Sequence, residues 1–225
     1  FSGLADVTGY EGGHPRILGS YFPDVISGTD AALAVVAALH HRERTGRSQY
    51  IDHSMIESLM AHLAEPIIDL TMNGRSPVRM GNHHPRIAPH NVYRCEGHDS
   101  WVAIAAETDE EWHVLCQIMG CPELAWDPRF ANCVARKRNE IDLDSIVNAW
   151  TCGRNKHELA KQLQLSGVHA APSVNPEELM DDEHLKARGF MVPIAHPDVG
   201  VRCYVGAPWR ISDMTPLYRH APLMG

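Results

Sequence analysis

One loop gathers the side chains that are best suited to bind an anion. Residues 75–89 read RSPVRMGNHHPRIAP, a run rich in proline, glycine, asparagine and basic residues. His83 and His84 offer ring nitrogens that can bind a carboxylate, or take up a proton as the pH falls towards about 6.5. Arg79 and Arg86 can each form two parallel hydrogen bonds to a carboxylate. The plainer interpretations stay open: ordinary polar histidines in a loop, and surface arginines that make no specific contact.

The histidines and cysteines lack the spacing of a metal site. The chain has 15 histidines and six cysteines, but no C-x-x-C or H-E-x-x-H pair of the kind that zinc sites show. His40-His41 and His83-His84 are adjacent in the sequence, so their side chains point to different faces of a helix or strand. We therefore predict no metal. Without a secretory context, the cysteines are predicted to be free thiols in a reducing compartment rather than a disulfide framework.

Charge and hydropathy narrow the possible partners. The 225 residues carry a net charge of -8, and no like-charge run extends beyond a few positions. Phosphate backbones are bound by clustered lysine and arginine, so a nucleic-acid partner is not expected. Asp30 and then His40-His41 interrupt the most apolar stretch, which predicts that none reaches membrane-spanning length. We expect a soluble, cytoplasmic protein with a substantial core.

The loop must be held by a scaffold, and the clearest element of that scaffold is a helix of about six turns, at 3.6 residues per turn. Pro23 and Asp24 suit its first turn, and Gly46 suits its left-handed carboxyl-terminal cap. Its broad apolar and alanine-rich stripe predicts buried packing, with an exposed alanine-rich helix as the alternative. A strand-like SQYID follows at residues 48–52. Tyr21 and Phe22 are expected in the core, or as the wall of an acyl pocket.

Further helices and strands are predicted on both sides of the loop. Before it, Ser54 and Glu57 form a capping box that opens a helix towards Asn73-Gly74, kinked at Pro66. After it, the runs NVYRCE and SWVAIAA form a hairpin around Gly97-His98-Asp99. The remaining expected elements are a helix capped by Thr108 and Glu111, helices over 136–149 and 156–166, a strand over 168–174, a helix start at 175–178, and strands from Phe190.

The run from Gly28 to Leu59 resembles the family III CoA-transferases, the group that includes formyl-CoA transferase and carnitine CoA-transferase. The family has a helix here, followed by an R-x-x-T-G-R-x-Q-x-x-D turn and strand. This pattern is matched by Arg42, Thr45, Gly46, Arg47, Gln49 and Asp52. The resemblance continues over nearly the whole chain, through Gly81-Asn82, Trp101, Asp109 with Trp112, Asp127-Pro128-Arg129-Phe130, Gly167-Val168, Arg188-Gly189-Phe190 and Gly206-Ala207-Pro208.

The resemblance implies an α/β fold: a partial Rossmann-like large domain plus a small α/β domain, in a homodimer whose two chains interlock. Residues 1–78 would belong to the large domain with its central helices. Residues 79–174 would form the linker and the small domain, and residues 175–225 would return towards the large domain. The family also implies further chain before Phe1 and a helical tail beyond Gly225.

The resemblance also implies the chemistry, which is transfer of CoA from an acyl-CoA thioester to a free carboxylic acid. An aspartate attacks the thioester carbonyl, and a mixed anhydride and then an enzyme-bound CoA thioester form. Coenzyme A is thus a substrate, and no bound cofactor is expected. The family's aspartate precedes an S-G-x-x-x-x-T-G stretch, matched here by Ser2-Gly3 and Thr8-Gly9, so its position falls before Phe1. Asp6 and Asp24 do not match that position.

No catalytic residue is therefore assigned, and the chain alone is expected to be inactive. The expected substrate-binding residues are Arg79, Gly81, Asn82, His83 and His84. In formyl-CoA transferase the comparable loop is glycine-rich and closes over the aspartate. Here the loop has only Gly81, and the histidines His83 and His84 come shortly after it. This difference favours a different acyl substrate. Two alternatives stay open: an acyl-CoA racemase of the same superfamily, and a non-catalytic module that binds CoA esters or serves as a scaffold.

Overall fold

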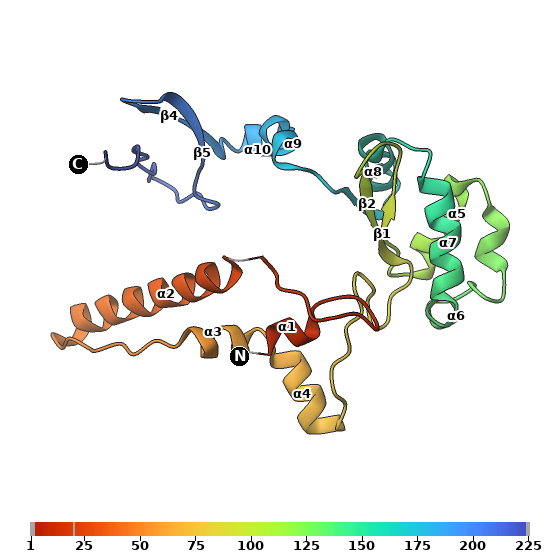
Figure 1. Cartoon of the computed structure of the whole chain (residues 1–225), viewed down its shortest axis with the longest axis horizontal. Helices are drawn as coiled ribbons and strands as arrows, with labels where there is room; N and C mark the ends of the chain where they lie inside the picture. Colours follow the sequence, from red (N-terminus) through yellow and green to blue (C-terminus); the bar gives the residue numbers. More distant parts are fainter. Residues whose placement is uncertain (1–2, 20, 224–225) are drawn as a thin grey trace. The chain divides into compact units, whose positions relative to one another are not determined.

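A computed structural model describes residues 3–19 and 21–223, and it is a mixed α/β structure (Figure 1). Ser2, part of the matched S-G stretch, lies outside the described residues, as do Phe1 and the terminal Met224-Gly225. The chain divides into two compact units, residues 1–171 and residues 172–225. The first unit contains the residues predicted to bind substrate.

The first unit opens with four helices. They are α1 (Leu4–Val7), α2 (Phe22–Thr45), α3 (Met55–Ala61) and α4 (Ala64–Asn73). The predicted long helix is confirmed as α2: Pro23 lies in its first turn, and Gly46 caps it with φ 71°. The predicted kink at Pro66 is a full break between α3 and α4, because proline cannot donate the backbone hydrogen bond that would join them. Ser54 caps α3 by accepting a hydrogen bond from the Glu57 amide.

Three predictions about this region are wrong. The buried packing expected for α2 is not observed, because Leu33 is 69% exposed and Val36 is 62% exposed. Tyr21 is 77% exposed and so lies outside the core, while its alternative place in the wall of an acyl pocket stays a prediction. The helix that packs against α2 is α3, which has seven residues and is far too short to cover a helix about 36 Å long. Residues 48–52 form no strand, because within residues 3–19 and 21–223 no segment offers the backbone partners that a strand needs.

The length of α2 also corrects the expectation about membrane-spanning stretches. Among the described residues, α2 is the one helix that is long and apolar enough to cross a membrane by length and composition. Asp30 is the only formally charged residue between Val25 and His41, so the interruptions weighed above do not break the stretch. Core helices of soluble proteins meet the same criterion, so length and composition do not assign this helix to a membrane.

A three-stranded sheet carries the centre of the first unit, with the order β1-β2-β3. The predicted hairpin is confirmed as β1 (His90–Arg94) and β2 (Trp101–Ala105), which pair antiparallel with His90 opposite Ala105 and Val92 opposite Ala103. The strand β3 (His169–Pro172) lies beside β2. Successive side chains of a strand point to opposite faces of the sheet, so Tyr93, Val102 and Ile104 face one side while Val92, Ala103 and Ala105 face the other.

Helices cover one face of this sheet and form the core with it (Figure 1). They are α5 (Asp109–Met119), the 3-10 helix η1 (Pro122–Trp126), α6 (Cys133–Arg138), α7 (Glu140–Thr151) and α8 (Lys156–Leu165). The fully buried side chains include Trp112, Leu115, Phe130, Leu143, Val147 and Leu163. Burial of each such side chain contributes about 1.5–3 kcal/mol, so this core fixes where the sheet and α7 lie.

The predicted helix boundaries within this part are confirmed with one exception. Thr108 and Glu111 make the reciprocal capping box that opens α5, and Gly120 closes the helix with φ 77°. The single helix expected over residues 136–149 is wrong, because the chain forms α6 and α7 with Asn139 between them. The Asn139 side chain donates to the carbonyls of Arg129 and Ala135, which ends α6 and sets the direction of α7.

The second unit contains two short helices and a hairpin. They are α9 (Pro176–Asp181), α10 (Glu183–Ala187), β4 (Met191–His196) and β5 (Gly200–Val205). The predicted helix start at residues 175–178 is confirmed as a reciprocal capping box between Asn175 and Glu178. The strands expected from Phe190 are confirmed as the antiparallel pair β4 and β5.

Candidate functional site

The loop predicted to bind substrate runs without helix or strand from Arg75 to Pro89, between α4 and β1. Its first half is attached to the chain's amino-terminal turns. Arg79 Nη1 donates to the Asp6 carbonyl at 2.8 Å and to Asp6 Oδ1 at 3.0 Å. The Gly81 amide donates to the Gly9 carbonyl at 2.8 Å. Arg79 is thus engaged by an acid of the same chain.

Gly81 occupies a position that only glycine fills without strain. Its φ is 61°, and a Cβ built on it would lie 2.6 Å from the Tyr10 ring. This left-handed backbone and close approach place the loop directly against residues 9–10. Gly81 therefore allows two distant segments of the chain to meet. Gly9 and Gly81, which contact each other there, are 72 positions apart in the sequence.

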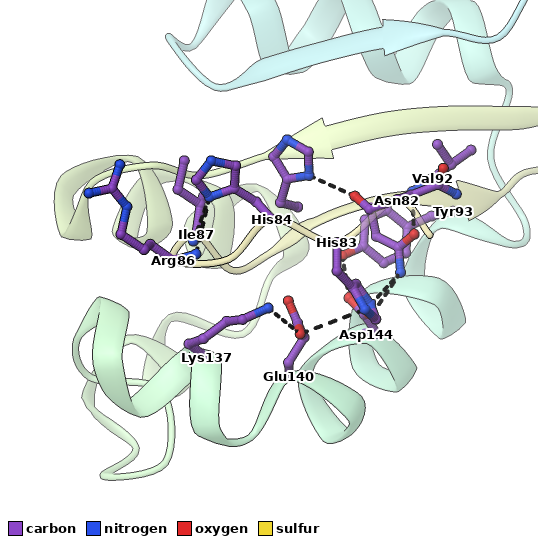
Figure 2. Close-up of polar contacts among 12 residues, drawn as sticks. Asn82, His83, His84, Arg86, Ile87, Val92, Tyr93, Lys137, Glu140 and Asp144 are labelled. Atoms are coloured by element: carbon purple, nitrogen blue, oxygen red, sulfur yellow. Dashed lines mark hydrogen bonds and ion pairs between the residues drawn. The ribbon is translucent and has the colours of Figure 1, made fainter. Parts of the chain in front are cut away.

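His83 points towards two acids of α7, Asp144 and Glu140 (Figure 2). Its Nε2 lies 2.7 Å from Asp144 Oδ2, and its Nδ1 lies 3.7 Å from Glu140 Oε2. Asp144 also accepts from the Tyr93 hydroxyl at 2.6 Å and from the Asn91 amide at 2.7 Å, while Lys137 Nζ lies 2.6 Å from Glu140 Oε2. Burial, together with the Asp144 carboxylate, holds the pKa of Tyr93 far above its ordinary value, so its hydroxyl stays a donor.

His84 caps the turn that follows it. Its Nδ1 accepts from the backbone amides of Arg86 at 3.2 Å and Ile87 at 3.1 Å (Figure 2). Burial lowers the pKa of His84 below 6.5, and the nearby charges of His90, Arg86 and Lys137 lower it further. A ring whose Nδ1 accepts two amides is the neutral tautomer with the proton on Nε2. His84 is therefore a structural cap of the loop in this geometry.

Asn82 and His90 join the loop to the first strand. His90 Nδ1 lies 2.8 Å from the Asn82 carbonyl oxygen, which can only accept, so Nδ1 carries a proton. The His84 and His90 rings lie side by side with centroids 5.4 Å apart. Both Asn82 and His90 line a hollow of about 800 Å³, and the hollow is also lined by residues of β2 and of the segment 164–171.

His83 also lines a smaller hollow of about 350 Å³. It is lined in part by Arg79, Lys137 and Glu140. Arg79 pairs with Asp6 and Lys137 pairs with Glu140, so both basic groups already have an acidic partner. The described residues include no group of three or more histidine, cysteine or acidic side chains placed to hold a metal ion.

The sequence predicted the loop but missed its partners Asp144, Asn91, Tyr93 and His90. A signal was present for three of them. Asn91 and Tyr93 alternate on the face of β1 that turns towards the core, where a polar side chain requires a buried partner. Glu140 and Asp144 lie one turn apart on α7, so their carboxylates share a face of that helix.

Comparison with known proteins decides the family. The sequence model of CoA-transferase family III matches residues 1–225. This chain belongs to CoA-transferase family III. Succinyl-CoA–D-citramalate CoA-transferase of Chloroflexus aurantiacus is 34% identical over 199 residues, which cover 88% of this chain and 49% of that protein. Succinate–glutarate CoA-transferase of Agrobacterium fabrum is 32% identical over 221 residues, which cover 98% of this chain and 54% of that protein.

A solved structure has the same fold. The crystal structure of a CAIB/BAIF family protein from Brucella suis matches with a TM-score of 0.82 and 32% identity, over 94% of this chain and 54% of that one. The mixed α/β fold expected from the sequence is thus confirmed, and it matches the fold of a CAIB/BAIF family protein. The chain spans about half the length of the curated relatives it matches.

Proposed function

We propose that this chain is part of an enzyme that transfers CoA between an acyl-CoA and a free carboxylic acid. The observation that carries the proposal is the match of the whole chain to CoA-transferase family III. The two relatives described above are named for CoA transfer to or from succinate, citramalate or glutarate, which are all dicarboxylic acids. We infer that at least one acid handled by this enzyme is a dicarboxylate.

The proposed reaction needs a carboxylate nucleophile. An aspartate displaces CoA thiolate from the acyl-CoA and forms a mixed anhydride, and the thiolate then attacks the aspartyl carbonyl and releases the first acid. The second acid reverses these two steps and leaves with CoA. Among the described acids near the loop, Asp6 pairs with Arg79 and Asp144 accepts three hydrogen bonds. We propose that the reacting aspartate lies outside these 225 residues.

The role proposed for the loop is to close one side of the substrate site. The residues expected from the sequence to bind substrate, Arg79, Gly81, Asn82, His83 and His84, would form this side of the site. Arg79 and His84 already have partners in this chain, so they would hold the loop in shape. His83 would act through its position, because both ring nitrogens already face acids of α7. We also propose that the chain divides into three parts, with boundaries after residues 78 and 174, and that the first part belongs to a Rossmann-like large domain. The enzyme would be an interlocked homodimer in the cytoplasm, without membrane or nucleic-acid partners.

One assay tests the proposal directly. The 225-residue chain, and any longer native protein that contains it, are incubated with succinyl-CoA and a panel of free acids, and the CoA esters formed are separated by chromatography. We expect the longer protein to form a new CoA ester and the chain alone to form none. The proposal fails if no protein form makes a new ester. Exchange of the α-proton of an acyl-CoA without a change of acid would indicate a racemase, and binding without turnover would indicate a non-catalytic module.

A further inference from the structure

The larger hollow lies on the face of the sheet that turns away from the core. His90 and Val92 of β1 are opposite Ala105 and Ala103 of β2, so these four side chains share that face. Loop residues 81–83 form one edge of the hollow, and residues 167–171 form the other. Alanines give its floor a shallow apolar surface on which an aliphatic chain can lie.

The titratable side chains that line the hollow are all histidines among the described residues. Its titratable lining residues are His83, His90 and His169, and the described residues that line it include no aspartate or glutamate. Histidine side chains are neutral or positive at any pH that the protein tolerates. An anionic ligand thus meets no like charge among the lining side chains.

Two of these histidines are already engaged by acids. His83 faces Asp144 and Glu140, and His169 Nε2 lies 3.4 Å from Glu111 Oε1. His90 differs, because its Nδ1 is fixed by the Asn82 carbonyl and its Nε2 has no partner among the described residues. His90 Nε2 can therefore take a ligand in the hollow without giving up a protein contact.

We propose that this hollow binds the acyl part of a dicarboxylic acid, with the carboxylate remote from the reacting one against His90 Nε2. The aliphatic carbons would lie over Val92, Ala103 and Ala105. This inference rests on the proposed function, because it concerns the substrate of that reaction. His90 is then the residue that makes a dicarboxylate bind more tightly than a monocarboxylate of the same length.

The interaction requires a second proton on the His90 ring. Nδ1 already donates to Asn82, so Nε2 can donate to a carboxylate only in the imidazolium form. The ring of His84 is the titratable group beside it, and the charges of Arg86, Lys137 and Glu107 also reach His84. Ligand binding should therefore move the ring signals of His90 towards those of its protonated form.

The test uses the 225-residue chain labelled at histidine and followed by nuclear magnetic resonance. The probes are glutarate and valerate, which have five carbons each and differ by one carboxylate. We expect glutarate to shift the His90 ring signals saturably, with an affinity at least about tenfold higher than that of valerate, since a charged hydrogen bond is lost with the second carboxylate. Unmoved His90 signals at saturating glutarate would overturn the inference.

Two variants sharpen the result. His90→Gln removes the charge but keeps a donor near Asn82, and it should bind both acids equally weakly. His98→Gln changes an exposed histidine of the hairpin turn and should bind them as the unaltered chain does. Retained preference for glutarate in His90→Gln would contradict the proposal. If this variant does not fold, the His90 signals of the unaltered chain decide the matter alone.

The outcome is separable from that of the proposed function. Binding is measured on the isolated chain and needs no turnover. Glutarate binding at His90 with no CoA transfer by any form of the protein would leave this inference standing and sink the proposed function. CoA transfer to dicarboxylates, with His90 ring signals that do not shift on addition of glutarate, would support the proposed function and overturn this inference.

Discussion

The His83 ring and the Asp144 carboxylate are joined at 2.7 Å, which links the loop after α4 to the middle of α7. The two residues are 61 positions apart in the sequence. Asp144 is largely buried and also accepts from Tyr93 and Asn91, so a single carboxylate fixes a loop and a strand together. This contact, together with the one between His90 and Asn82, holds the loop against the sheet.

Replacing Asp144 should therefore destabilise the first unit. Asp144→Ala leaves the buried Tyr93 hydroxyl and the Asn91 amide without their acceptor, and we expect a loss of about 1–3 kcal/mol in the free energy of unfolding. The measurement is urea denaturation followed by fluorescence. Asp142→Ala is the matched control, since its side chain is 65% exposed on the same helix and should change stability by less than about 0.5 kcal/mol. Equal effects of the two substitutions would refute the role given to Asp144.

Arg136 is a second long-range connection. It is fully buried: its Nε donates to the Ala88 carbonyl at 2.7 Å, and its Nη1 donates to Asp109 Oδ1 at 2.8 Å. Arg136→Met removes these donors at once, and we expect a loss of about 3 kcal/mol in unfolding free energy. Arg138→Met, an exposed neighbour on the same helix, serves as the control. A loss below about 0.5 kcal/mol for Arg136→Met would show that the buried bonds contribute nothing net.

Gly81→Ala tests the close approach of the loop to residue Tyr10. The left-handed backbone costs alanine about 1–2 kcal/mol. The Tyr10 ring, 64% exposed, can swing aside at little further cost. We expect faster hydrogen exchange at the backbone amide of position 81, which donates to the Gly9 carbonyl in the unaltered chain. Gly153→Ala is the control, because a Cβ there meets no atom within 4 Å. Unchanged exchange in Gly81→Ala would contradict this account.

Acid should loosen the loop through His84. The pKa of His84 is lowered in the folded chain, chiefly by burial, while the unfolded chain keeps a value of about 6.5. The unfolded chain therefore binds the proton more readily, so the contribution of His84 is complete above pH 6.5 and is lost as the pH falls through the lowered pKa. We expect His84→Gln to show a smaller loss of stability between pH 7 and pH 5 than the unaltered chain. Identical pH profiles would exclude His84 as a source of acid sensitivity.

The cysteines should separate into protected and reactive groups. Burial raises the pKa of the Cys116 thiol to about 12, and it also raises that of Cys95. Cys152 and Cys203 are exposed free thiols. Iodoacetamide labelling at pH 8, read by mass spectrometry, should modify the exposed pair at least about tenfold faster. In urea all should react alike, and rapid labelling of Cys116 in the folded chain would contradict its burial.

Features that depend on neighbouring residues could be predicted from the sequence. The capping box of Thr108 with Glu111 follows from one short segment, as does the hairpin turn between β1 and β2. The 79–84 loop could be recognised from its composition, although nothing local showed what its side chains contact. His83 was expected to face a substrate, while the structure turns it to Asp144 and Glu140 and leaves His90 facing the larger hollow.

The sequence by itself determined most helix starts and stops, the hairpin of β1 and β2 and the family resemblance, because these depend on residues within a few positions or on an ordered motif. Only the tertiary structure decided which side chains meet across long separations and which apolar faces are covered. The strand expected at residues 48–52 did not form, and α2 stayed exposed, for one physical reason: a strand or an apolar helix face is stabilised by a partner, and its own residues do not supply that partner.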